Sequence, residues 1–407
     1  MIKYAEGSGF LVLAVGDKLM EVMNTKGFKP KGDKTITDFN VKELLQEMVR
    51  LDASDIYITV GIPPIYRKEG INTSFGSKNL TAEDTRILAE SIMSDKQRED
   101  FYEKMEMNLA LYYPELGRFR VNIFLQQRNI GIVIRQIKIN IKTIDDLNLP
   151  QIFKDIIMTK RGLVLVVGAT GSGKSTTLAA MIDYRNTNSS GHIITVEDPV
   201  EFVHPHKKSV ITQREVGIDT LSFGDALKNT LRQAPDVILV GEIRDTETME
   251  SAITFAETGH LCLGTLHANN ANQAIERVIN FFPSERHEQI YLLLSLNLCA
   301  IISQRLVPAK DGKRVASFEI LLDTPRIKDL IIKKEIGLLK ETMSRGTQEG
   351  MLTFDQSLFN LYKEGKVSYE NAIAYADSAN DLRLRIKTEG LGEAKEDKTA
   401  SFKLKRD

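Results

Sequence analysis

The sequence predicts an α/β protein: an α+β N-terminal domain, then an α/β domain with a largely parallel sheet and a helical C-terminal region. Apolar stretches that read as strands alternate with helical stretches, which is typical of a parallel sheet. A glycine-rich loop separates the first of these strands from a helical run, and 407 residues suffice for two or more domains. The apolar stretches are residues 163–167 (LVLVV), 192–196 (HIITV), 237–240 (VILV) and 261–266 (LCLGTL).

Composition places the chain among ordinary soluble globular proteins. The net charge of −1 lacks the basic excess that nucleic-acid-binding domains usually carry, so we expect no nucleic-acid partner. Cys262 and Cys299 form no CxxC pair, which fits a reducing cytoplasm. No segment approaches the roughly 18 apolar residues that span a bilayer, so we expect no direct membrane insertion and attachment to a membrane only through a partner.

The first domain begins with apolar residues at helical spacing. Residues 41–51 predict an amphipathic helix, residues 55–60 (DIYITV) a strand, and Thr81 the start of a second helix with acidic residues in its first turn. Residues 118–138 predict two strands joined by a QQRN turn. Residues 1–35 leave two alternatives open, a loosely attached extension or an additional docked strand or helix.

The predicted boundaries give six segments. They are an N-terminal extension (1–35), the first domain (36–140), a linker with a short helix at 151–160 (141–160), the α/β core (161–285), a helical C-terminal part (286–387) and a disordered tail (388–407).

The loop that follows residues 163–167 has the spacing G-x-x-x-x-G-K-[ST]. Its glycines let backbone N–H groups turn inward around phosphate oxygens, and the helix behind it directs its positive end at them. Lys174 is expected to reach the β- and γ-phosphates of ATP, and the Ser175 hydroxyl to coordinate Mg²⁺. The predicted nucleotide-binding residues are Gly168, Thr170, Gly171, Ser172, Gly173, Lys174, Ser175 and Thr176.

Acidic residues follow two of the predicted strands. Glu242 comes just after the strand at 237–240, where it either holds Mg²⁺ through water or caps a helix, whereas Asp236 lies at the wrong end of that strand. Glu197, Asp198 and Glu201 surround a proline at the end of another strand. ATP hydrolysis needs a carboxylate near the attacking water, although acidic residues at strand ends are also common surface features.

At this point four motifs occur in order: GATGSGKSTT (168–177), TVEDPVEF (195–202), VILVGEIRD (237–245) and TGHLCLGTLH (258–267). Together with residues 53–70 they resemble the secretion ATPases of type IV pili and type II secretion, and among these the retraction motors of the PilT/PilU family. The resemblance covers about residues 37–380. It implies a PAS-like N-terminal domain and a RecA-like ATPase domain.

The resemblance also implies roles for individual residues. Glu201 matches the catalytic glutamate, and Glu242 the glutamate of the second acidic strand, which in this family follows a glycine. His260 and His267 match two histidines that sense the γ-phosphate. Arg120 and Arg135, with less support for their neighbour Arg118, match arginines that reach the nucleotide from the N-terminal domain.

Because Cys262 lies between the two histidines, a second interpretation is that His260, Cys262 and His267 are three ligands of a metal ion. Zinc takes four ligands in a tetrahedron, and no nearby pair completes such a set. Cys262 is therefore expected to be a small apolar strand residue. His260 and His267 are expected to bracket the strand, with at least one near the γ-phosphate.

Residues 325–335 (PRIKDLIIKKE) and the extended C-terminus resemble PilU more than PilT. The family implies a homo-hexameric motor in the cytoplasm that is recruited to the inner-membrane base of the pilus machine, with a PilT-type ATPase and a PilC-like platform protein as partners.

One alternative is an assembly ATPase of the pilus or of type II secretion, but two cysteines cannot build that group's four-cysteine zinc module. A nucleotide-binding ring subunit without hydrolysis and a nucleic-acid translocase are further alternatives.

Overall fold

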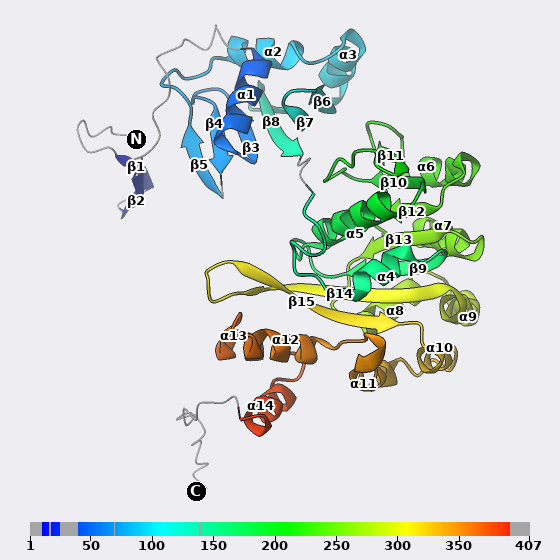
Figure 1. The fold of residues 1–407 in the computed structure, drawn as a ribbon. Coiled ribbons are helices and arrows are strands. Elements are labelled where there is room, and N and C mark those ends of the chain that lie inside the picture. Colours follow the sequence, from blue (N-terminus) through cyan, green and yellow to red (C-terminus); the bar gives the residue numbers. More distant parts are fainter. Residues whose placement is uncertain (1–9, 16–17, 25–39, 69, 138–140, 391–407) are drawn as a thin grey trace, which may run out of the picture. The chain divides into compact units, whose positions relative to one another are not determined.

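The computed structural model describes residues 40–68, 70–137 and 141–390, and the backbone of residues 10–15 and 18–24 (Figure 1). The chain divides between Gln136 and Ile137 into two compact units, near the predicted end of the first domain at residue 140. The predicted tail lies outside the described residues except for residues 388–390. Within the predicted extension, β1 (Phe10–Val15) and β2 (Lys18–Asn24) pair as an antiparallel hairpin.

Unit 1 is built on a six-stranded antiparallel sheet with the strand order β5-β4-β3-β8-β7-β6. Three helices pack on it and share one apolar core with the strands. The elements are α1 (Val41–Leu51), β3 (Asp55–Ile58), β4 (Ile65–Lys68), β5 (Ile71–Ser74), α2 (Ala82–Glu90), α3 (Asp95–Lys104), β6 (Glu106–Tyr113), β7 (Gly117–Gln126) and β8 (Asn129–Ile137).

Local sequence signals account for most of this unit. The predicted helix at 41–51 is confirmed, and its apolar face is buried. Thr81 caps α2 as expected, and its backbone N–H donates a hydrogen bond to the Asp84 carboxylate, which completes a capping box. The predicted QQRN turn is confirmed as a two-residue turn at Gln127 and Arg128, both with positive φ.

Unit 2 contains a seven-stranded sheet with the strand order β11-β10-β12-β13-β9-β14-β15. Every pair is parallel except β14 with β15, so the predicted parallel sheet is confirmed. The strands are β9 (Gly162–Val167), β10 (Gly191–Glu197), β11 (Ser209–Glu215), β12 (Val237–Val240), β13 (Leu261–Leu266), β14 (Leu298–Pro308) and β15 (Arg314–Leu322).

Helices cover both faces of this sheet. Along β9, Leu163, Leu165 and Val167 join the core beneath α6 to α11, whereas Val164 and Val166 join the core beneath α4 and α5. Because both faces are covered, the central strands read as continuous apolar runs. The helices of these two layers are α4 (Ile152–Met158), α5 (Lys174–Asn188), α6 (Phe223–Thr230), α7 (Thr246–Glu257), α8 (Ala271–Asn280), α9 (His287–Asn297), α10 (Pro325–Ile332) and α11 (Leu339–Arg345).

The C-terminal part differs from the prediction. Residues 286–387 were expected to be helical, but residues 298–308 and 314–322 form the β14–β15 hairpin at one edge of the sheet. A short apolar run such as LCAIIS does not distinguish a buried helix from a buried strand by periodicity. Residues 298–308 form a strand because they pair with the edge of β9 that β13 leaves open. This pairing buries Ile301 in one core and Ile302 in the other.

Three further helices follow: α12 (Phe354–Lys363), α13 (Tyr369–Ala374) and α14 (Ala379–Thr388). They form a small apolar cluster of their own with Val307 of β14, and α12 packs against β15 (Figure 1). No helix in the described part of the chain is both long and apolar enough to cross a membrane.

Candidate nucleotide-binding site

The loop at residues 168–173 connects the carboxyl end of β9 to the first residue of α5, Lys174. Gly168, Gly171 and Gly173 all have positive φ. A Cβ atom on Gly168 would lie 2.5 Å from the carbonyl oxygen of Gln304 and 2.6 Å from Ser172 Oγ. Glycine is therefore required at position 168 by both backbone conformation and space. The loop surrounds the amino end of a fifteen-residue helix, where N–H groups favour anions.

Lys174 lies back over this loop. Its ammonium group donates hydrogen bonds to the carbonyl oxygens of Gly168 at 2.8 Å and Ala169 at 3.1 Å. Burial lowers the pKa of Lys174, and the nearby carboxylate of Glu242 opposes that shift. The cation is therefore held beside both the loop and Glu242, as phosphate binding requires.

Gln304 of β14 supports the loop from below. Its side-chain oxygen accepts a hydrogen bond from Thr177 Oγ1 of α5 at 2.8 Å, and both residues are buried. A Cβ atom on Gly173 would meet the Gln304 amide nitrogen at 2.8 Å. The sequence analysis did not identify Gln304, although a glutamine within an apolar run was a visible signal.

A pocket of about 330 Å³ opens beside the loop. One wall is the loop itself, from Gly168 to Ser172. The other wall comes from residues distant in sequence: Asn269, Gln304, Arg305, Leu306, Arg314 and Tyr375. The pocket offers basic and hydrogen-bonding groups next to the phosphate loop.

Glu242 follows β12 at the same edge of the sheet. Its Oε1 lies 3.0 Å from His267 Nε2, and its Oε2 accepts a hydrogen bond from Arg244 Nη2 at 2.6 Å. Hydrogen bonding to Arg244, with the charges of Arg244 and Lys174, lowers the pKa of Glu242 despite partial burial. The side chain that caps α7 is Asp245, so the alternative that Glu242 is the helix cap is wrong. Asp236 lies at the opposite end of β12, where it accepts a hydrogen bond from the His192 N–H at 2.7 Å, as expected.

The glycine before Glu242 has a steric reason. A Cβ atom on Gly241 would lie 2.9 Å from Glu197 Cα and 3.0 Å from the carbonyl oxygen of Val196. The ends of β10 and β12 therefore approach each other more closely than any side chain at position 241 would allow.

The three acidic residues after β10 occupy different environments. Glu197 is partly buried, accepts a hydrogen bond from Thr195 Oγ1 at 2.7 Å, and has a pKa raised to about 7 by burial. Asp198 lies 3.8 Å from Arg244 Nη1. Glu201 is exposed beyond Pro199 and Val200. A cavity of about 30 Å³ connects Ser175 with Glu197 and Gly241, so the predicted Mg²⁺ ligand Ser175 lies near the ends of β10 and β12.

His260 and His267 bracket β13, as expected, but only His267 lies at the site. Leu261 pairs with Gly162 and Leu266 with Val167, so β13 and β9 run in register. His260 therefore lies at the amino end of the parallel strands. The six residues of β13 place it about 20 Å from the edge at which the loop at 168–173 lies. Its Nδ1 is 3.0 Å from Thr258 Oγ1. His260 is therefore remote from the loop of its own chain, and its phosphate-sensing role stays a prediction.

Cys262 is fully buried within β13 and carries no disulfide. It joins the apolar core, as expected of a small strand residue. The two histidines are separated by the length of the strand, so the three side chains do not surround a common point.

Arg120 and Arg135 belong to unit 1, on β7 and β8. Arg135 Nε lies 2.8 Å from Asp55 Oδ1 of β3, in an ion pair whose carboxylate is buried and whose guanidinium is mostly exposed. Arg120 is half-buried opposite Ala110, and Arg118 lies two residues earlier, opposite Tyr112. Their approach to a nucleotide held by unit 2 stays a prediction.

Comparison with known proteins extends these observations. The family model described as "Type II/IV secretion system protein" matches residues 30–321. The type IV pilus ATPase PilU of Pseudomonas aeruginosa is 56% identical over 85% of this chain and 91% of its own length. The type IV pilus retractation ATPase PilT of the same organism is 44% identical over 82% of this chain and 97% of its own length.

A solved structure gives the corresponding result for the fold. The crystal structure of the pilus retraction motor PilT and bound ADP aligns with a TM-score of 0.80 and 42% identity. The alignment covers 85% of this chain and all of that one. This similarity supports an α/β ATPase and covers both units.

The loop geometry makes a first prediction. Gly168→Ala should weaken binding of ATP about tenfold or more, because the new methyl group overlaps Gln304 and Ser172 and the backbone must leave its left-handed conformation. A titration with a fluorescent ATP analogue measures this.

Gly217→Ala is the matched control. Gly217 also has positive φ, but a Cβ atom there has no heavy atom within 4 Å. This variant should bind ATP like the parent chain. Equal affinities of the Gly168→Ala variant and the parent would contradict the role assigned to the loop.

Proposed function

The chain belongs to the type II/IV secretion system protein family, and from this premise we propose that it is an ATP-hydrolysing motor of type IV pilus retraction and twitching motility. One observation carries the proposal: the loop lysine Lys174, Glu242 and His267 meet at the carboxyl edge of one parallel sheet. The higher identity to PilU than to PilT, 56% against 44%, supports a PilU-like member.

The site binds the triphosphate of ATP through the loop. Backbone N–H groups from Gly168 to Ser175 and the amino end of α5 receive the β- and γ-phosphate oxygens, and Lys174 exchanges its two carbonyl contacts for phosphate oxygens. Ser175 Oγ and, through water, the Glu242 carboxylate would hold Mg²⁺. The lowered pKa of Glu242 keeps it ionised for that purpose. When bound, Mg²⁺ neutralises charge on the phosphates.

Glu201 acts as the general base for the attacking water. Of the acidic residues after β10, Glu197 accepts a hydrogen bond from Thr195, and its pKa, raised by burial to about 7, leaves it only partly ionised near neutral pH. Glu201 is the exposed carboxylate beyond the bend, free to approach a water in line with the γ-phosphate. His267 reports the γ-phosphate through its contact with Glu242.

The finer architecture follows the family. Unit 1, about residues 36–140, is a PAS-like domain, and residues 141–160 are a linker whose hinge lies near residues 141–150. The remainder is a RecA-like ATPase domain extended by the β14–β15 hairpin and the C-terminal helices. Arg120 and Arg135 approach the nucleotide when the hinge closes. Closure does work only if ATP binds the closed form more tightly than the open form.

The assembled motor is a homo-hexameric cytoplasmic ring at the inner-membrane base of the pilus machine. It acts with a PilT-type ATPase on a PilC-like platform protein. In α10, the apolar residues Ile327, Leu330 and Ile331 are buried. The lysines that stand where PilT-type motors carry arginines lie outside the core: Lys328 in α10, and Lys333 and Lys334 just after it. This exposed difference supports dependence on a PilT-type partner.

Glu201→Gln should lower ATP turnover about 100-fold or more while ATP still binds, because the water loses its base but the loop is unchanged. Phosphate release and nucleotide binding, measured on the same preparation, separate the two effects. Lys174→Ala should lose binding itself.

Glu257→Gln, at an exposed position ending α7, is the control and should turn over ATP normally. Full activity of the Glu201→Gln variant would remove Glu201 as the base. A parent chain that binds ATP without turnover would instead favour the nucleotide-binding ring subunit.

Arg135→Ala should lower ATP turnover about 100-fold or more, because positive charge is lost where negative charge develops on the phosphoryl group. Asp55→Asn tests the alternative that Arg135 only stabilises unit 1, since it breaks the ion pair but keeps the arginine. We expect this variant to retain most activity in the same turnover assay. Equal losses in both variants would contradict a catalytic Arg135.

A further inference from the structure

The four residues His267 to Asn270 connect β13 to α8 and are fixed at both ends. At the first, His267 Nε2 lies 3.0 Å from Glu242 Oε1. At the second, Asn270 caps α8, and the next N–H, from Ala271, donates to Glu319 Oε1 at 2.7 Å. Only four residues therefore separate the contact with Glu242 from the contact with Glu319.

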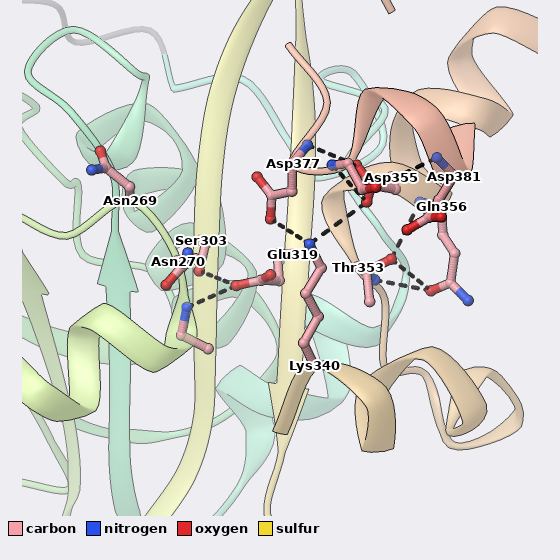
Figure 2. Close-up of polar contacts among 12 residues, drawn as sticks. Asn269, Asn270, Ser303, Glu319, Lys340, Thr353, Asp355, Gln356, Asp377 and Asp381 are labelled. Atoms are coloured by element: carbon pink, nitrogen blue, oxygen red, sulfur yellow. Dashed lines mark hydrogen bonds and ion pairs between the residues drawn. The ribbon is translucent and has the colours of Figure 1, made fainter. Parts of the chain in front are cut away.

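Glu319 is an unusual residue to find at this place. It lies on β15 with 1% of its surface exposed, and Ser303, directly opposite on β14, donates to the same Oε1 at 3.1 Å (Figure 2). Burial raises the pKa of Glu319. A buried carboxyl group is costly to desolvate, so an apolar residue would serve stability better than this one. What the carboxyl group adds is a directed contact with the start of α8.

Arg305, two residues after Ser303 on the same face of β14, holds the middle of the connection. Its Nη2 donates to the carbonyl oxygen of Asn269 at 3.3 Å. Its Nη1 donates to the carbonyl oxygen of Tyr375 at 3.0 Å and lies 2.7 Å from Asp377. The guanidinium also lies 3.8 Å from the centre of the Phe354 ring, so it contacts α12 and the segment between α13 and α14.

Asp377 extends the network to two more elements. Lys340 of α11 lies 3.0 Å from Asp377 Oδ2, and the Asp377 N–H donates to Asp355 Oδ1 of α12 at 2.8 Å (Figure 2). A polar pocket of about 390 Å³ separates these groups from the connection and is lined by Asn269, Arg305, Glu319, Lys340 and Asp377. The connection therefore has space to move without displacing close-packed atoms.

We propose that Glu319 and Arg305 are positioning residues that hold the His267–Asn270 connection against Glu242 and link it to helices α11–α14. The inference rests on the proposed function, in which His267 responds to the γ-phosphate. ATP, which carries that phosphate, and ADP, which lacks it, then favour different positions of the connection. The C-terminal helices follow those positions through Arg305 and Asp377.

The test compares Glu319→Ala with Glu319→Gln in the full chain, by equilibrium binding of ADP and of a non-hydrolysable ATP analogue, both with Mg²⁺. Glu319→Ala should lower the preference for the ATP analogue over ADP about tenfold and leave ADP affinity within twofold. Glu319→Gln should restore the preference, because its side-chain oxygen still accepts from Ala271 and Ser303. Asp323→Ala, which breaks an exposed ion pair after β15, is the control and should change neither affinity.

Asp377→Asn keeps the test decisive if Glu319→Ala fails to fold. It breaks the ion pairs with Arg305 and Lys340 at a position near the surface and should lower the preference about threefold. An unchanged preference in Asp377→Asn, or in a folded Glu319→Ala variant, overturns the inference.

His267→Ala, measured in parallel, separates this inference from the proposed function. We expect His267→Ala to lose the preference for the ATP analogue over ADP. The His267→Ala/Glu319→Ala double variant should lose no more of this preference than His267→Ala alone. If His267→Ala keeps the preference, the role of His267 in the proposed function is wrong. If it loses the preference while Glu319→Ala retains it, only the positioning role is wrong.

Discussion

The parallel pairing of β9 with β13 on one side and β14 on the other is the constraint on which the rest of the site depends. Parallel strands end at a common edge, so the loop after β9 meets Glu242 after β12 and His267 after β13. The pairing with β14 also places Gln304 beneath the loop, where it bonds Thr177. A shift of register in either pair would separate these groups.

This dependence explains which parts of the site could be predicted from the sequence. The loop and the start of the helix behind it are encoded within the ten residues 168–177, and the position of Glu242 follows from one short strand. The bracketing of β13 by His260 and His267 was predicted from the strand between them, but which of the two lies at the loop follows only from the parallel register of β13 with β9. The roles of Gln304 and Glu319 could not be predicted, because their hydrogen-bond partners are distant in sequence. Thr177 lies 127 residues from Gln304, and Ala271 lies 48 residues from Glu319.

The β14–β15 hairpin shows the same limit at the level of the fold. Its apolar residues are compatible with a helix, and only the edge of β9 makes them a strand. Once formed, the hairpin presents Ser303 and Arg305 on one face and Gln304 on the other, as strand alternation requires. The hairpin thus supports the phosphate loop through Gln304 and, through Arg305 of β14 and Glu319 of β15, contacts the connection after His267 and the C-terminal helices.

A structure of the full chain with Mg²⁺ and a non-hydrolysable ATP analogue would show directly where the triphosphate and the metal ion bind. Our account predicts that the β- and γ-phosphates lie in the loop at 168–175 with Lys174 Nζ on their oxygens. It also predicts Mg²⁺ on Ser175 Oγ, one water away from Glu242, and His267 within reach of the γ-phosphate. Phosphates bound elsewhere, or Glu242 and His267 remote from the γ-phosphate, would contradict it.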